Sequence, residues 1–383
     1  MKNSDLDSFL KNEDDWLWLC AVPELDWKQK MTLLHYFGSP EAIRQAEKSE
    51  FNDWERVGID WIRKLYACLH TGFLDEIKEQ MEKKRVAFIS RGHPAYPKRL
   101  RTICDAPYGL FYKGKLPESA PLYVGIVGAR ACSTYGSAMA RQIAGGLAES
   151  GIHVVSGMAM GVDGISQKAA VEAGGTSFAV LGCGPDRCYP RMNIELYMSL
   201  QEKGGILSEY PCNTKAQAWY FPARNRIISG LSDILVVIEA GKRSGSLITA
   251  EHALSQGREV YAVPGRVNDP LSEGCNALIR DGAGVIVSAD LFTEMIRNLS
   301  NERYGPLQSE TAGKKTDGTD EKRSFETPEE AVIYMKLGML PVTPERLKAE
   351  TGLSMAQVHR SLLRLQLADL ASEIARNQFV KQK

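Results

Sequence analysis

The chain has 383 residues, of which 44% are hydrophobic and 25% charged, and its 47 basic and 47 acidic residues leave no formal net charge. This length predicts two or three domains, and the composition is that of a globular protein rather than a disordered one. A net charge of zero argues against polybasic binding of nucleic acid over the whole surface, so any anion site must be local.

The eight cysteines and the N-terminal segment narrow the class of protein further. No C-x-x-C pair occurs, so neither a metal site nor a disulfide framework is predicted. The first fifteen residues are polar and acidic, unlike a secretory signal, and no apolar run approaches the roughly 18 residues of a membrane span. We therefore expect a cytoplasmic protein with free thiols and no membrane partner.

Residues 1–84 form the first predicted domain, which is helical because its apolar residues recur every three or four positions from Trp16 onward. One helix is predicted to end at Gly38, and the next begins after Ser39 and Pro40. This join is typical of SAM-like or helix-hairpin-helix-like domains. A plain helical bundle used for packing or for protein partners is an equally good interpretation.

Residues 85–298 form the second predicted domain, with a Pro- and aromatic-rich connecting region at 85–121 and a short strand over 86–89. From about 115 to 295, short apolar runs alternate with helical stretches such as 136–150 and 245–257. This alternation predicts a Rossmann-like, doubly wound α/β domain with a parallel sheet. The predicted strands lie at 122–127, 153–155, 177–181, 206–207, 234–238 and 260–263.

Residues 299–327 are predominantly polar and predict a flexible linker. Residues 328–383 follow as a third domain, with predicted helices from Pro328 to Leu340 and from Pro344 to Leu370, the second broken at Gly352. The helix-turn-helix layout indicates a winged-helix-like module. Such modules bind DNA or protein partners, and the acidic residues of this segment leave both possibilities open.

The first predicted strand of the α/β domain runs into a glycine-containing turn that suits an anion. Gly128, Arg130 and Ser133 lie between this strand and the next helix, whose N-terminus offers unpaired N–H groups. A dinucleotide site would need G-x-G-x-x-G and an acidic residue after the second strand. The second strand ends instead in Ser156 and Gly157, a second anion cradle, so neither NAD nor any other cofactor is predicted.

Two further segments carry groups that bind phosphate. Ser244, Gly245 and Ser246 open a helix after a buried strand and form another predicted anion site. The other segment, 221–226, combines an aromatic ring for base stacking with cationic and amide groups for phosphates. Its candidate residues are Phe221, Arg224, Asn225 and Arg226. The alternative is that the two arginines pair with acids such as Glu209 or Glu239. Four such loops at one sheet edge fit a run of phosphates better than one nucleotide.

Six motifs in this domain resemble those of the DprA/Smf family of DNA-processing proteins. They are SGMAMGVD (156–163), AVLGCG (179–184) with YP (189–190), ILSEYP (206–211), FPARNRIISGLSD (221–233), SGSLITAEHAL (244–254) and REVYAVPG (258–265). The resemblance implies single-stranded DNA binding, homodimerisation through the α/β domain, and loading of a RecA-type recombinase during natural transformation in competent cells. It also implies that the DNA contacts Arg130, Ser156, Gly157, Phe221, Arg224, Asn225 and Arg226.

The chain departs from that family pattern at three positions. Met160 and Gln167 stand where many relatives have arginine and histidine, so neither can serve as a charged contact. Ala218 replaces a lysine that binds DNA in some members, and Lys215 is the nearest candidate to replace it.

Two other classes of function were weighed against DNA binding. Residues 244–249 loosely resemble the nucleotide phosphoribohydrolases of the lysine-decarboxylase-like fold, but their P-G-G-x-G-T loop is missing. Glu239 and Asp163 would be the acid–base pair of such an enzyme, with no supporting His, Cys or Lys. We therefore predict no catalytic residue and no enzymatic activity. A pure protein adaptor would leave Arg130, Arg224 and Arg226 without a role.

Overall fold

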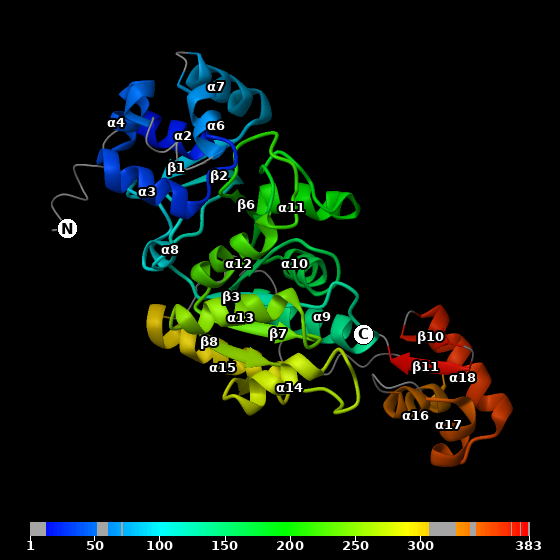
Figure 1. The fold of residues 1–383 in the computed structure, drawn as a ribbon. Helices are drawn as coiled ribbons and strands as arrows, with labels where there is room; N and C mark the ends of the chain where they lie inside the picture. The colour runs from blue at the N-terminus through cyan, green and yellow to red at the C-terminus, as the bar shows by residue number, and fades with distance from the viewer. Residues whose placement is uncertain are drawn as a thin grey trace. The chain divides into compact units, whose positions relative to one another are not determined.

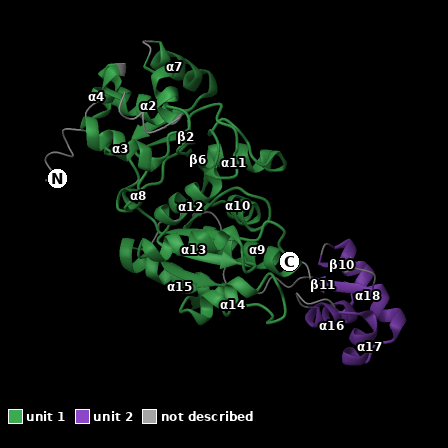
Figure 2. Ribbon diagram, in the orientation of Figure 1, with its two compact units in different colours: residues 1–307 green, residues 308–383 purple. Residues whose placement is uncertain are grey.

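The computed structural model describes residues 13–51, 60–69, 72–305, 327–337, 342–368, 370–375 and 377–381. The chain divides into two compact units, residues 1–307 and 308–383 (Figure 2). Each unit has its own apolar core and is described by itself.

The first unit begins with helices that gather around β1 and β2 (Figure 1). They are α2 (Glu13–Ala21), α3 (Trp27–Phe37), α4 (Pro40–Gln45), the short 3₁₀ helix η1 (Lys48–Phe51), α6 (Asp60–Ala67) and α7 (Phe73–Lys84). The predicted join is confirmed, because α3 ends at Gly38 and the Ser39 hydroxyl caps the N-terminus of α4. Helix α2 is buried along most of its length against β1 and β2, which anchors these helices to the sheet.

The sheet has nine strands in the order β1-β2-β6-β5-β4-β3-β7-β8-β9. All six predicted apolar runs are strands, and β3 to β9 are parallel. The region 85–121 is more than the connection we expected, because it supplies β1 and β2 as an antiparallel edge. The strands are β1 (Ala87–Ser90), β2 (Gly109–Gly114), β3 (Tyr123–Gly128), β4 (His153–Ser156), β5 (Ser177–Leu181), β6 (Gly204–Ser208), β7 (Ile234–Ile238), β8 (Glu259–Ala262) and β9 (Gly284–Val285).

Helices cover both faces of this sheet, as a doubly wound fold requires. Apolar side chains of α12, α13 and α14 pack on one face, and those of α9, α10 and α15 pack on the other. Because both faces are buried, the central strands are predominantly apolar. The helices are α8 (Lys98–Arg101), α9 (Thr134–Glu149), α10 (Val162–Glu172), the 3₁₀ helix η2 (Arg191–Asn193), α11 (Ile194–Lys203), α12 (Tyr220–Leu231), α13 (Gly245–Ser255), α14 (Glu273–Arg280) and α15 (Ala289–Tyr304).

The predicted linker begins too early in the chain. Helix α15 continues to Tyr304, because Phe292, Ile296 and Ser300 are buried on its inner side, so residues 299–304 are helical. The sequence pattern missed this because only one residue per turn of α15 is buried. The part of the predicted linker from 306 to 326 lies outside the described residues.

The described residues of the second unit form three helices followed by a two-stranded antiparallel sheet. They are α16 (Pro328–Lys336), α17 (Pro344–Thr351), α18 (Met355–Leu367), β10 (Ala371–Ala375) and β11 (Gln378–Lys381). The predicted break at Gly352 is confirmed, because this residue ends α17. The predicted helix ends at Leu340 and Leu370 differ from the structure, in which α16 ends at Lys336 and α18 at Leu367. Residues 338–341 lie outside the described residues. In neither unit does the described part of the chain contain a helix with the length and apolar character of a membrane span.

Candidate functional site

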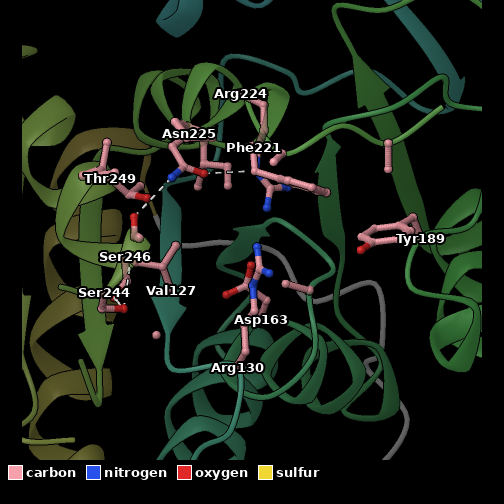
Figure 3. Close-up of a pocket in the computed structure, with 18 residues that line it drawn as sticks. Val127, Arg130, Asp163, Tyr189, Phe221, Arg224, Asn225, Ser244, Ser246 and Thr249 are labelled. Atoms are coloured by element: carbon pink, nitrogen blue, oxygen red, sulfur yellow. Dashed lines mark hydrogen bonds between the residues drawn. The ribbon is translucent and has the colours of Figure 1, made fainter. Parts of the chain in front are cut away.

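A pocket of about 500 Å³ lies where the order of the strands reverses. The chain moves outward from β3 through β4, β5 and β6 in one direction, then from β7 through β8 and β9 in the other. Ligands of doubly wound folds bind at the carboxyl ends of the strands at such a switch point. We call this cavity the switch-point pocket. The loops after β3 and β7 and the first turns of α12 and α13 form much of its wall (Figure 3).

Eight of the thirteen predicted site residues line the switch-point pocket, although they come from three separate segments of the chain. They are Gly128, Arg130, Phe221, Arg224, Asn225, Ser244, Gly245 and Ser246. Five others do not line it, namely Ser133, Ser156, Gly157, Lys215 and Arg226.

Phe221 is the aromatic centre of the pocket. Two guanidinium groups lie near its ring, with Cζ of Arg130 5.4 Å and Cζ of Arg224 5.9 Å from its centroid (Figure 3). The ring of Tyr189 lies 5.5 Å away at an interplanar angle of 32°. Arg130 and Tyr189 are exposed, and no described carboxylate forms an ion pair with Arg130. The pocket therefore presents an aromatic surface next to an unpaired cation.

Arg224 forms part of the pocket wall but is almost fully engaged by the protein. Its Nη1 donates to the carbonyl oxygens of Gly157 and Val180, and its Nε donates to Asn225 Oδ1. A Cβ at residue 157 would lie 2.2 Å from the guanidinium, so Gly157 makes room for Arg224 rather than for a ligand. Burial lowers the pKa of Arg224, and the nearby carboxylate of Asp163 opposes this shift.

Arg226 does not line the switch-point pocket, where the sequence predicts it, and its contact with DNA stays a prediction. It lies on another side of α12, where Nη2 donates to both carboxylate oxygens of Glu209 at 2.9 and 2.8 Å. Its Nε lies 3.3 Å from a carboxylate oxygen of Asp105. Burial alone lowers the pKa of Arg226, but the two carboxylates outweigh it and the pKa is raised. The pairing with acids, weighed as the alternative, is what the structure contains.

The N-terminus of α9, the first predicted anion site, is already occupied by a carboxylate of the protein itself. Glu239 accepts hydrogen bonds from the backbone N–H of Ser133, at 2.7 Å, and from its hydroxyl. The Ser133 hydroxyl in turn accepts from the N–H of Gly136. Glu239 is buried and has a φ of 51°. The predicted role of Ser133 in phosphate binding is therefore corrected: it binds an internal anion.

The predicted second cradle at the end of β4 is closed as well. The Ser156 hydroxyl is buried and donates to the carbonyl oxygen of Ile126 at 2.6 Å, while the N–H of Gly157 donates to Asp163 at 3.1 Å. Burial raises the pKa of the Asp163 carboxyl, against the effect of Arg224. Both groups thus hold strands and helices together, and the prediction that they bind phosphate is corrected.

Gly128 lines the pocket, but its close neighbour is another strand. A Cβ there would lie 1.9 Å from the carbonyl oxygen of Ile238, so glycine is needed for β3 to approach the end of β7. The steric role of this glycine concerns the sheet, and its predicted contact with a phosphate stays a prediction.

The first turn of α13 is the helix N-terminus that opens onto the pocket. The hydroxyls of Ser244 and Ser246 lie 2.7 Å apart, and Asn225 Nδ2 donates to the carbonyl oxygen of Gly245. Thr249, one turn further, completes this wall opposite Tyr189 (Figure 3). Two exposed cations, Lys242 and Arg243, directly precede Ser244. No described carboxylate is bonded to this helix N-terminus.

Sequence reasoning missed several residues of the pocket. Tyr189 belongs to the quoted YP motif, so its aromatic ring was a usable signal. Thr249 follows Ser246 by three residues on a predicted helix, which places both on one face. Asp163 was considered only as a catalytic acid, and the contact of its carboxylate with Gly157 depends on the tertiary structure.

The positions that depart from the family pattern are now placed. Gln167 is buried and bonded to Met158, Ser177 and Phe178, so it is structural. Ala218 lines the switch-point pocket, whereas Lys215 lines a different cavity. Lys215 therefore does not take the place of the missing lysine at this pocket.

The residues that bind metals and cofactors elsewhere do not converge in the described part of the chain. No cluster of three or more His, Cys, Asp or Glu side chains occurs there, and all eight cysteines are unpaired. Glu239 and Asp163 are engaged by Ser133 and Gly157. The exposed chemistry of the pocket is an aromatic surface, a cation and a hydroxyl-rich helix N-terminus.

Together, the fold and the pocket define a Rossmann-like α/β protein whose first phosphate-binding turn is closed by its own carboxylate. A family model described as DNA recombination-mediator protein A matches residues 87–297. This match covers more than half of the chain, and the chain belongs to that family.

Relatives and solved structures agree with this membership. Protein Smf from Escherichia coli (strain K12) is 42% identical over 229 residues, a match that spans 57% of this chain and 60% of that protein. The crystal structure of DNA processing protein A from Streptococcus pneumoniae has a TM-score of 0.62 at 34% identity and covers 74% of this chain and 99% of its own. A structure that describes the single-stranded DNA binding mode of DNA processing protein A from Helicobacter pylori has a TM-score of 0.52 at 29% identity, and covers 56% of this chain and 97% of its own.

Proposed function

We propose that this protein binds single-stranded DNA in the switch-point pocket, without catalysing a reaction on it. The observation that carries the proposal is the ring of Phe221 next to the exposed guanidinium of Arg130. An aromatic surface stacks a base of any sequence, and an adjacent cation binds the phosphate that follows it. The similarity to the Helicobacter pylori protein, whose structure concerns single-stranded DNA binding, supports this assignment.

Three features favour a strand of DNA over a mononucleotide or dinucleotide. The N-terminus of α9, where such folds hold a pyrophosphate, is filled by Glu239. The α13 N-terminus and Arg130 both line the pocket and can contact successive phosphates. The candidate acid–base pair of a hydrolase, Glu239 and Asp163, is engaged in structural hydrogen bonds, which supports the absence of catalysis.

The test is a titration of labelled oligo-dT and of duplex DNA with the full chain at several salt concentrations. We expect salt-sensitive binding that prefers the single strand. Phe221→Ala should weaken binding roughly tenfold or more, because stacking on an aromatic side chain contributes about 1–3 kcal/mol per base. Tyr36→Ala is the matched control, since Tyr36 is exposed on α3 and lines neither cavity. Preference for duplex DNA, or an unchanged affinity of Phe221→Ala, would refute the proposal.

We further propose that the protein forms a homodimer through the α/β domain. Exposed apolar side chains follow the edge strand β9, with Val285 and Val287 in and after the strand and Leu291 and Met295 one turn apart on α15. An open strand edge beside an apolar surface favours association. Val287→Glu should shift the molecular mass in light scattering to that of a monomer, and an unchanged dimer would place the interface elsewhere.

In this proposal, the protein hands its strand to a RecA-type recombinase in the cytoplasm during natural transformation. Family membership supports this role. We interpret the second unit as a winged-helix module, because three helices precede a hairpin and Val342 bridges Phe379 of β11. Recombinase filament assembly on oligonucleotide coated with single-strand-binding protein should accelerate with the wild-type chain and not with Phe221→Ala. If filaments assemble equally fast with the wild-type chain and with Phe221→Ala, DNA binding in the pocket is not needed for recombinase loading.

A further inference from the structure

A second cavity, of about 970 Å³, lies on another side of α12 from the switch-point pocket. Its walls are the end of α2, the start of α3, part of α7 and the chain from Glu209 to Arg226. It therefore lies between the N-terminal helices and the α/β domain, within the first compact unit.

The two cavities share one wall. Along the segment that precedes α12, Ala216 and Ala218 line the switch-point pocket, while Lys215, Gln217 and Trp219 line the second cavity. Residues 215–217 have no regular secondary structure, and a turn follows in which the N–H of Tyr220 donates to the carbonyl oxygen of Gln217 at 3.0 Å. Successive side chains of this segment thus line different cavities. A ligand that crosses this single segment passes from one cavity into the other.

Aromatic rings line the second cavity on two sides. Tyr210 and Tyr220 lie 4.0 Å apart by ring centroids, and Trp219 contacts Tyr220 edge-on at 5.9 Å. On the α3 side, Trp27 stacks on Tyr108 at 6.1 Å. Trp219 is 66% exposed, although tryptophan side chains are mostly buried in folded proteins. Such surfaces stack nucleobases irrespective of sequence.

The polar groups of the second cavity suit a base with its phosphates. Lys28 and Lys215 are exposed, and no described carboxylate forms an ion pair with either. Deeper in the wall, Nη1 of Arg226 and Oε1 of Gln217 are buried without a hydrogen-bond partner. An unmatched donor and acceptor are what the edge of a base satisfies.

Four acidic side chains line the cavity, of which three are ion-paired, while Asp26 caps the N-terminus of α3. Their partners are Arg226 for Glu209 and Asp105, Lys64 for Glu24, and the N–H of Gln29 for Asp26. Lys28 and Lys215 are therefore left to attract phosphates.

We propose that the second cavity receives a base of the same DNA strand that occupies the switch-point pocket. Trp219 is the stacking surface where the strand crosses the shared wall, and Lys28 and Lys215 contact the flanking phosphates. This inference rests on the proposed function, which assigns single-stranded DNA to the first pocket.

The test compares a series of oligo-dT lengths, from about four to about twenty nucleotides, because site sizes of single-strand binding folds span this range. For the wild-type chain, affinity should rise again once the strand is long enough to reach the second cavity. Trp219→Ala should lower the affinity for long oligonucleotides roughly tenfold and leave that for the shortest binding length unchanged. Tyr36→Ala, at an exposed aromatic outside both cavities, should match the wild type at every length.

Two filling variants separate the cavities. Ala218 and Ala223 are both exposed and line the first and the second cavity respectively. Ala218→Trp should weaken binding at all lengths, whereas Ala223→Trp should reproduce the long-strand defect of Trp219→Ala. The proposal is overturned if these two variants, Ala223→Trp and Trp219→Ala, weaken the binding of short and long oligonucleotides by the same factor. It is also overturned if they weaken binding at no length.

Two results distinguish other causes. If oligo-dT of no length binds the wild-type chain, the proposed function fails and not only the second site. If dTMP or ATP binds with an affinity that Trp219→Ala weakens, while long oligo-dT is unaffected, the cavity belongs to a free nucleotide and the inference is wrong.

Discussion

The N-termini of α9 and α13 face the same switch point, yet they differ in what they can bind. Both follow a central strand, and both begin with a serine whose hydroxyl accepts from a backbone N–H. At α9 the carboxylate of Glu239 has already taken the anion position, whereas no described carboxylate is bonded to the start of α13. An anion site in such a fold is thus defined by which helix N-termini the protein has left free.

The two arginines of the 221–226 motif are both buried and differ in their partners. Arg224 lines the pocket, and Arg226, two residues later on the same helix, is buried in a carboxylate pair. We call Arg226 and Glu239, which are bonded within the protein, the closed group, and Arg130 and Phe221, which face the pocket, the open group. We expect the closed group to supply stability and the open group to supply DNA binding.

The largest effect on stability is expected at Arg226. Arg226→Ala leaves Glu209 without its buried partner and should lower the free energy of unfolding by about 3–5 kcal/mol, measured by urea denaturation. The double change Arg226→Met with Glu209→Leu should recover much of this loss, since no unpaired charge is then buried. If Arg226→Ala instead keeps its stability and loses DNA binding, Arg226 belongs to the open group.

Half-buried His153, which belongs to neither group, makes the stability of the protein depend on pH below about 6.5. Burial, followed by the charges of Arg99 and Lys115, lowers the pKa of His153 to about 4. Between its unfolded value near 6.5 and about 4 the unfolded chain binds the proton and the folded chain does not, so stability is lost as pH falls through this window. The loss should reach at most about 3 kcal/mol.

Thermal or urea unfolding from pH 7 to pH 4 measures this loss. In His153→Phe the pH dependence over that window should be flatter, because the aromatic contacts with Tyr123 and Phe178 can be kept without a titrating group. An unchanged pH profile of the variant would assign the loss to other residues.

Opening the α9 N-terminus should cost less. Glu239→Ala removes the acceptor of two hydrogen bonds from Ser133 and should lower the free energy of unfolding by about 2 kcal/mol. Inorganic phosphate at millimolar concentration should then stabilise the variant and not the wild type, because the vacated site is a helix N-terminus. Glu239→Gln is the control, since its amide oxygen can still accept from the backbone N–H. Absence of phosphate rescue would show that Glu239 does not stand in for a bound anion.

The smallest effect is expected for Arg130, which is exposed and unpaired. Arg130→Ala should change stability by less than about 0.5 kcal/mol. It should reduce the salt dependence of single-strand binding by about 0.7 in the log–log slope, the contribution of one phosphate contact. Arg303→Ala is the matched control, because Arg303 is exposed on α15 and lines neither cavity. If Arg130→Ala and Arg303→Ala give the same salt-dependence slope, Arg130 does not contact the DNA.

Sequence by itself determined the parallel strands β3 to β8, the doubly wound class of the domain and part of the pocket. The six apolar runs were found because strands buried on both faces are apolar at every position, whichever neighbours they pair with. Gly128, Phe221 and Ser244 were placed at one site because the carboxyl ends of parallel strands meet at one sheet edge. The apolar character of a strand and the edge at which it ends can both be predicted from the order of residues in the sequence.

Only the tertiary structure decided which of the charged and polar groups remain available. Glu239 meets Ser133, and Arg226 meets Glu209, across long separations in sequence and between different elements. A motif shows that a helix N-terminus or an arginine is present, but its partner is chosen by packing. In the same way, the alternation of residues 215–219 between two cavities depends on what the fold places on each side of that segment.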